Sequence, residues 1–511
     1  MPSRTTGVGT AVPLIAIAVW QLLSSSGLLD YEYLPSPREV LSALVSLART
    51  GELAADVTHT LGVALAASAI TLTVGGALGL TIGLFATVRG CVMASIDFLR
   101  TIPAVCLVPV AVLMLGPAAT TELTLAVYAA LWPMLLTTAA GVAAVSPRQY
   151  DVARMLHLSR AATLRKIVVP AVLPAWLVGA RLSAVITLLV AIVAEMVMYP
   201  RGLGGGLVES LNALAPARMW AYALVCGVIG YALNGTLRHA VRLVQPGDPA
   251  VAGGQVAVTA APAAAQPVTP PHGLLPVVAL LVVWQITADG DSWSLPPPAV
   301  WLTALRRMGA DGTLAPALTQ TLTTFLLGLA CAAVVGAAAG AMIGASRRMD
   351  RALTPAIDFL AAVPGAALVP VVVLVVGPTQ LSGVLAVALV AYWPILLNTA
   401  MAMRTVPAVR LEMSRTLGLA PLPRWTKVVI PSLVPGILLG TRVAAAIALI
   451  ITLLVDIFGP GAGVGRLLLE SQQRFDAAAA WGLLLVMGIF GYLASACLAW
   501  IARRATKVWQ P

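Results

Sequence analysis

Long apolar stretches alternate with short polar segments along almost the whole chain. As helices rising about 1.5 Å per residue, most of these stretches could cross the roughly 30 Å hydrocarbon core of a membrane. They lie at 8–26, 58–87, 93–115, 121–143, 171–199 and 218–241, and again at 274–289, 319–346, 354–376, 381–402, 432–458 and 479–502. We therefore predict an all-α polytopic membrane protein with about 12 transmembrane helices.

The two sets of six stretches are copies of one unit. Trp132-Pro133 recurs as Trp393-Pro394, an offset of 261 residues, and Asp97 recurs as Asp358 at the same offset. An even number of spans returns the chain to the same side, so the two units form tandem parallel six-helix repeats. We assign residues 1–244 to the first transmembrane unit and 273–511 to the second. Residues 245–272, rich in Ala, Pro, Val and Gly, are predicted to form a flexible cytoplasmic linker.

Composition and charge exclude the soluble classes. Only 10% of the residues are charged and 59% are hydrophobic, whereas a soluble domain carries about a quarter charged residues. The net charge of +11 comes from Lys and Arg gathered in the loops on one side of the predicted spans, for example Arg148 and Arg404. That bias places both termini in the cytoplasm and makes a nucleic-acid partner unnecessary.

Other sequence features limit the chemistry further. The five cysteines stand singly in or beside apolar stretches, so no metal site and no disulfide framework is expected. The sequence has no G-x-x-x-x-G-K-[ST] phosphate-binding loop, so any ATP-driven motor must be a separate chain. The first apolar stretch follows a single Arg4 and lacks a clear small-residue cleavage site, so we expect it to be a retained span rather than a signal peptide.

The segment between the fourth and fifth span is unusually long in each unit and reads as short helices. In the second unit Glu412 is followed by Gly418 and then by Ile430-Pro431; in the first, Asp151 is followed by Ile167 and then by Pro170 at the same spacing. This pattern resembles the Glu-Ala-Ala motif of type I ABC importer permeases. The resemblance covers nearly all of both units and implies the transmembrane-domain fold of that family.

The resemblance also implies partners and a role for the two loops. Two ATP-binding cassette subunits would bind ATP and magnesium and dock on the loops, and an extracytoplasmic binding protein would deliver the solute. This chain would form the whole translocation pathway in the cell inner membrane. It would hold no cofactor and would not be an enzyme. The coupling residues would be Asp151, Val152, Ala153, His157, Pro170, Glu412, Met413, Ser414, Gly418 and Pro431.

The presence of three residue types in these loops has a physical reason. Small residues permit close approach, the glycine permits a sharp turn, and the proline is expected to start the fifth span without leaving an orphan N–H donor. His157 stands where the family has glycine, and a side chain disfavours a left-handed turn. We therefore expect the two loops to be inequivalent.

The entry segments of the two units narrow the family. Leu34-Pro-Ser-Pro and Leu295-Pro-Pro-Pro each precede a short amphipathic segment. This order is similar to the nitrate, sulfonate and taurine permeases, a subgroup that also takes up vitamin precursors, so a small organic anion is the expected type of cargo. A secondary transporter with a parallel six-plus-six repeat, driven by an ion gradient, is the alternative.

Charged residues and prolines inside the spans are candidates for the translocation path or its gate. Arg181 and Arg442 either attract an anion or bond carbonyls or a neighbouring carboxylate such as Asp97 or Asp358. Glu195 and Asp456, near the outer ends of the fifth spans, serve an outer gate or a binding-protein contact, or simply lie at the interface. Pro103, Pro109, Pro364 and Pro370 are expected to break the third spans, either exposing backbone groups to the path or only kinking the packing.

Overall fold

The computed structural model describes residues 6–28, 31–198, 201–244, 271–289, 292, 294–459 and 461–509, and these residues contain helices but no strand. The first unit comprises α1 (Thr6–Ser25), α2 (Pro37–Thr50), α3 (Glu52–Ile70), α4 (Gly76–Leu84), α5 (Ala86–Leu99), α6 (Ala104–Leu115), α7 (Ala119–Ala143), α8 (Pro147–Met155), α9 (Arg160–Thr163), α10 (Val169–Met198), α11 (Leu203–Asn212) and α12 (Pro216–Val244).

The second unit repeats this order after a 3-10 turn at Pro271–Leu274. It comprises α14 (Leu275–Thr287), α15 (Pro298–Ala310), α16 (Leu314–Ala345), α17 (Arg347–Leu360), α18 (Leu368–Val376), α19 (Gln380–Arg404), α20 (Ala408–Thr416), α21 (Pro421–Arg424), α22 (Ile430–Phe458), α23 (Val464–Gln473) and α24 (Ala477–Trp509). The predicted linker at 245–272 lies outside the described residues except for its last two positions.

The helices confirm a polytopic membrane protein. Within the described ranges, eight helical segments are long and apolar enough to cross a membrane, and two bent helix pairs raise the number to as many as 10. Two shorter apolar helices, Ile15–Ser25 and Leu275–Thr287, correspond to the first span of each unit. The amphipathic segments predicted after the proline-rich entries are also confirmed, as α2 and α15.

The third span of each unit is broken at its first proline, as predicted, whereas Pro109 and Pro370 lie inside α6 and α18 and end neither helix. α5 and α6 meet at 90°, and the corresponding helices of the second unit meet at 76°. Pro103 occupies the position before α6, and Pro364 precedes the 3-10 turn Gly365–Ala367 that leads into α18. Because proline lacks an N–H and disfavours a helical residue before it, the helix ends there and restarts in a new direction.

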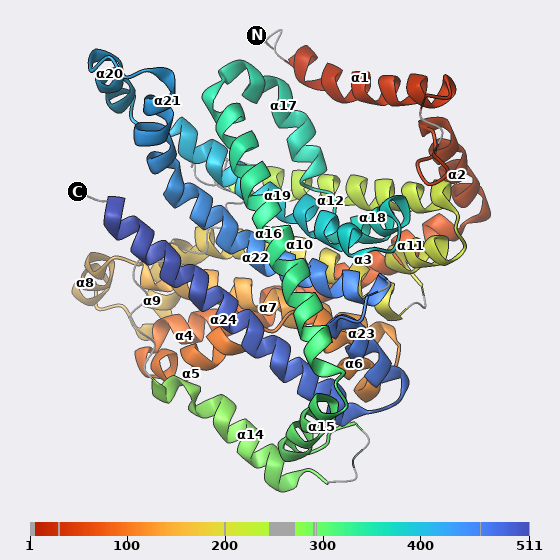
Figure 1. Ribbon diagram of the computed structural model, residues 1–511. Coiled ribbons are helices and arrows are strands. Elements are labelled where there is room, and N and C mark those ends of the chain that lie inside the picture. Colours follow the sequence, from red (N-terminus) through yellow and green to blue (C-terminus); the bar gives the residue numbers. More distant parts are fainter. Residues whose placement is uncertain are drawn as a thin grey trace.

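The two units pack together through equivalent helices. α12 contacts α17 and α18 of the second unit, and α24 contacts α5 and α6 of the first, so the interface has approximate two-fold symmetry (Figure 1). The same aromatic pair occurs twice across it, with ring centroids 5.8 Å apart for Tyr231 and Phe359 and 6.4 Å apart for Phe98 and Tyr492. The first helices cross over as well, because α1 contacts α17 and α14 contacts α5.

Glycines bring this interface to backbone contact. A Cβ atom on Gly230 of α12 would lie 2.4 Å from the carbonyl oxygen of Ala362, and one on Gly491 of α24 would lie 2.8 Å from that of Thr101. Both carbonyls belong to the bends of the broken third spans. A backbone oxygen cannot move aside as a flexible side chain can, so only glycine fits at these two positions.

We predict that Gly230→Ala weakens the association of the two units. The added methyl group would displace the bend at Ala362, and overpacking of this kind costs about 1–3 kcal/mol. The midpoint of thermal unfolding of the purified protein should therefore fall. The control is Gly235→Ala on the same helix, where a Cβ meets no atom within 4 Å; equal midpoints for the two variants would contradict the role of the glycine contact.

Candidate functional site

The loop between the fourth and fifth span has the same conformation in both units. α8 and α20 are nine-residue helices that project at one end of the molecule, at the left of Figure 1. Each ends in the same pair of backbone hydrogen bonds: Leu158 N–H to Ala153 and His157 N–H to Arg154 in the first, Leu419 N–H to Ser414 and Gly418 N–H to Arg415 in the second. This is the Schellman arrangement, which requires a left-handed residue just beyond the helix.

The left-handed residues are His157, with φ of 51°, and Gly418, with φ of 65°. The sequence comparison predicted that a side chain at residue 157 opposes this turn, yet the backbone adopts it there as well. Histidine therefore carries a conformational cost of about 1 kcal/mol that glycine does not. The two loops are alike in shape and differ in local stability.

The proposed coupling residues divide into two sets by exposure. Ala153 and Ser414, at equivalent positions, are only 3% and 2% exposed and turn toward the body of the protein. Asp151, Val152, Glu412 and Met413 are exposed. The sequence pattern missed exposed apolar residues beside them, namely Met155, Leu156, Val409 and Leu417. A sequence signal for them exists in the first loop: Val152 and Leu156 are four residues apart and so share one face of a short polar helix outside the spans.

The role predicted for Pro170 and Pro431 as the start of the fifth span is wrong in detail. The chain is already helical from Arg160 and Pro421, and it passes through the π-helical turns Leu164–Val168 and Trp425–Val429 before reaching them. Each proline is the second residue of the long helix that follows, α10 or α22. A π turn directly before a proline accommodates the missing N–H without ending the helix.

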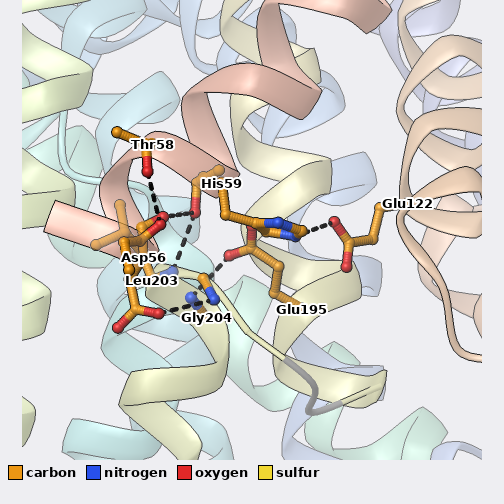
Figure 2. A network of polar contacts seen from close by, with 10 residues as sticks. Asp56, Thr58, His59, Glu122, Glu195, Leu203 and Gly204 are labelled. Atoms are coloured by element: carbon orange, nitrogen blue, oxygen red, sulfur yellow. Dashed lines mark hydrogen bonds and ion pairs between the residues drawn. The ribbon is translucent and has the colours of Figure 1, made fainter. Parts of the chain in front are cut away.

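At the far end of α10 and α22, a buried carboxylate binds the start of the next short helix. Glu195 accepts a hydrogen bond of 2.9 Å from the N–H of Gly204 in α11, as Figure 2 shows. In the second unit Asp456 accepts from the N–H of Gly465 at 3.4 Å and from the hydroxyl of Thr321 at 2.6 Å. A carboxylate at a helix N-terminus compensates its unpaired donors and its dipole.

This geometry argues against one of the three roles left open for these acidic residues. Glu195 is fully buried and Asp456 is 2% exposed, so neither can contact a binding protein directly, and their depth in the membrane stays a prediction. The glycines beside them are required sterically, because a Cβ on Gly202 would lie 2.3 Å from the Glu195 carboxyl carbon. The carboxylates hold α11 and α23 against the fifth spans, and a role in an outer gate remains a prediction.

The two intramembrane arginines occupy different surroundings. Arg181 is buried and donates to the side-chain oxygen of Asn234 in α12, at 2.9 Å from Nη2. Arg442 is half-buried and lies within electrostatic range of Asp97 and Arg100 of the first unit and of Arg503. Arg181 thus bonds an amide oxygen of its own unit, whereas Arg442 faces charges across the boundary between the units.

Comparison with known proteins identifies the family. The family described as "Binding-protein-dependent transport system inner membrane component" matches residues 53–247 and again residues 316–507. The chain belongs to this family. It is a multi-pass inner-membrane permease component of an ATP-driven importer, a class that works with ATP-binding and substrate-binding partners, and it carries two permease units in one chain.

Individual relatives align with one unit at a time. The nitrate import permease protein NrtB of Synechocystis sp. is 28% identical over 243 residues, which cover 45% of this chain and 88% of the relative. The taurine transport system permease protein TauC of Escherichia coli is 28% identical over 251 residues, 47% of this chain and 89% of the relative. The bicarbonate transport system permease protein CmpB of Synechococcus elongatus is 26% identical over 239 residues, 44% and 86% respectively. Less than half of the permease therefore covers nearly the full length of each of these relatives.

We predict opposite effects from reciprocal substitutions in the two loops of the permease. His157→Gly removes the cost of a left-handed side chain and should slow amide hydrogen exchange at the end of α8, whereas Gly418→His introduces that cost and should speed exchange at the end of α20. A cost of about 1 kcal/mol corresponds to roughly a fivefold change in exchange rate. Each loop is the control for the other by mass spectrometry of the same sample, and equal responses would remove the inferred inequivalence.

Proposed function

We propose that the permease imports a small anion handed over by an extracytoplasmic binding protein, with one ATP-binding subunit docked on each of its two loop helices. The observation that carries the proposal is the pair of matched projections, α8 and α20, which place exposed apolar side chains outside the spans at equivalent positions. In this arrangement both termini are cytoplasmic, and ATP and magnesium are bound by the partner subunits.

Force would enter the permease through these two helices. Val152 and Met413 occupy the same position on α8 and α20 and are exposed, which suits contact with a cleft of a motor subunit. Ala153 and Ser414, the next residues, are buried and fix each helix to the body of its own unit. A push on the exposed face would then be transmitted by the continuous helical path that runs from α9 into α10 and from α21 into α22.

The opposite end of the spans offers a matching pair of features for the binding protein. Leu214 and Phe475 follow α11 and α23 at equivalent positions, and they are 62% and 68% exposed. Both have left-handed backbones, with φ of 50° and 55°. A large apolar side chain in a strained, exposed turn contributes nothing to its own fold, so a contact with a partner is the natural reason for it.

The anionic cargo is inferred from charge as well as from relatives. Arg442, Arg100 and Arg503 bring positive charge to the boundary between the units, with Asp97 as the neighbouring carboxylate, and Asp97 is paired with Arg100 at 2.9 Å. The relatives named for nitrate, bicarbonate and taurine handle solutes that carry an anionic group. We assign Arg442 the role of attracting that group on the path between the units.

A crossed pair of double variants tests the two docking surfaces. Val152→Asp with Met413→Asp should prevent copurification of the ATP-binding subunits while leaving binding-protein affinity unchanged, because a buried apolar contact gains an unpaired charge. Leu214→Asp with Phe475→Asp should do the reverse. Copurified ATPase and binding-protein affinity are measured on both variants, so each serves as the control for the other. Cargo accumulation in vesicles by the permease alone, driven by an ion gradient, would overturn the proposal.

The charge of the cargo is tested at Arg442. Proteoliposomes holding the permease, its ATP-binding subunits and its binding protein are supplied with labelled nitrate, bicarbonate or taurine. For a transported anion, Arg442→Gln should lower the initial rate at least tenfold and Arg442→Lys should lower it less, because the charge is retained. The control is Arg306→Gln on the exposed face of α15; the same rate in both glutamine variants would remove the assigned role.

A further inference from the structure

Three side chains of metal-ligating type converge inside the first unit, at the far end of its spans. His59 comes from α3, Glu122 from α7 and Glu195 from α10, and one potential ligand atom of each lies within 4.8 Å of the other two. Figure 2 shows both glutamates directed toward the imidazole ring. The closest pair is His59 Nε2 and Glu122 Oε2, at 2.9 Å. None of these residues belongs to the coupling loops.

The two glutamates are left incompletely satisfied. Both are 0% exposed, and the Oε1 atom of each has no hydrogen-bond partner among the described residues. Neither glutamate forms an ion pair with an Arg or Lys among the residues that the structure describes. Glu122 has the imidazole of His59 beside it, but two adjacent buried carboxylates that each keep an unpartnered oxygen are costly unless a further positive charge neutralises them.

We propose that His59, Glu122 and Glu195 bind a divalent metal ion, with Zn²⁺ as the preferred ion. One imidazole nitrogen and two carboxylate oxygens form a three-ligand set that suits zinc and leaves a fourth position for water. Ca²⁺ requires six to eight oxygen ligands, which this cluster does not supply. The other oxygen of Glu195 accepts from the Gly204 N–H, an arrangement that orients Oε1 toward the ion.

The second unit cannot form this site. The positions equivalent to His59, Glu122 and Glu195 hold Gln320, Gly383 and Asp456. Only the carboxylate remains there, and one of its oxygens is held by the hydroxyl of Thr321 and the N–H of Gly465. The inference therefore requires one metal ion per chain, bound asymmetrically.

The ion would join α3 to α7 and α10, the two helices that flank the loop of the first unit, so its effect on transport rests on the proposed function. It links α3, α7 and α10 directly, and it reaches α11 through the bond between Glu195 and Gly204. The side chain of His59 is 25% exposed, which provides a route for the ion from the surface. Bound metal would make the first unit the more rigid half of the permease.

The test uses the full chain in detergent, purified through an affinity tag without histidine and stripped with a chelator. Titration with Zn²⁺, followed by calorimetry and elemental analysis, should give one ion per chain and a rise in the thermal midpoint. Glu122→Gln and His59→Gln should each weaken binding at least tenfold, and Glu209→Gln, at an exposed position of α11, should bind as the unaltered protein does. X-ray absorption of the bound zinc should show nitrogen and oxygen ligands without sulfur.

A second measurement guards against variants that merely unfold. Without metal, Glu122→Gln should be at least as stable as the unaltered chain, because the amide oxygen still accepts from His59 while one of two adjacent buried carboxylates is removed. If the unaltered chain binds no more Zn²⁺ than the two ligand variants, or if sulfur ligands appear in the absorption spectrum, the site does not exist. Protons alone would then neutralise the cluster.

Discussion

The close approach of the two units depends on the absence of side chains at two equivalent places. Gly230 and Gly491 lie against the carbonyl oxygens of Ala362 and Thr101, where the third span of the other unit turns. The contact requires both the bend and the glycine. A straight third span would not present a turn to the glycine, and a larger residue than glycine would hold the turn at a greater distance. The aromatic pairs Phe98–Tyr492 and Tyr231–Phe359 add apolar contact to the same interface.

The two units keep the same backbone conformation at several equivalent positions, whereas the side chains at these positions differ. Both units place a carboxylate against the start of a short helix, both end the loop helix in a left-handed residue, and both expose an apolar side chain after α11 or α23. The chemistry at these matched positions differs. His157 occupies the left-handed position that Gly418 occupies in the second unit, and His59, Glu122 and Glu195 are replaced at the equivalent positions by Gln320, Gly383 and Asp456.

Burial separates residues that act on partners from residues that hold the loops in place. Neighbouring positions of one short motif fall into different sets, since Val152 is exposed and Ala153 is buried. The same reasoning applies at the other end of the spans, where buried Glu195 fixes α11 and exposed Leu214 lies just beyond that helix. A motif is therefore a poor guide to contact unless the orientation of each side chain is known.

The sequence by itself determined the membrane class, the tandem repeat, the breaks at Pro103 and Pro364 and the position of the two loops, because each follows from local composition, from spacing along the chain or from the covalent geometry of proline. Only the tertiary structure decided what those elements meet. His59, Glu122 and Glu195 are separated by 63 and 73 residues in the chain, Arg181 bonds Asn234 on another helix, and Glu195 bonds the start of α11. Such contacts depend on how helices rotate and pack against one another, and the spacing of residues within any single helix does not specify that.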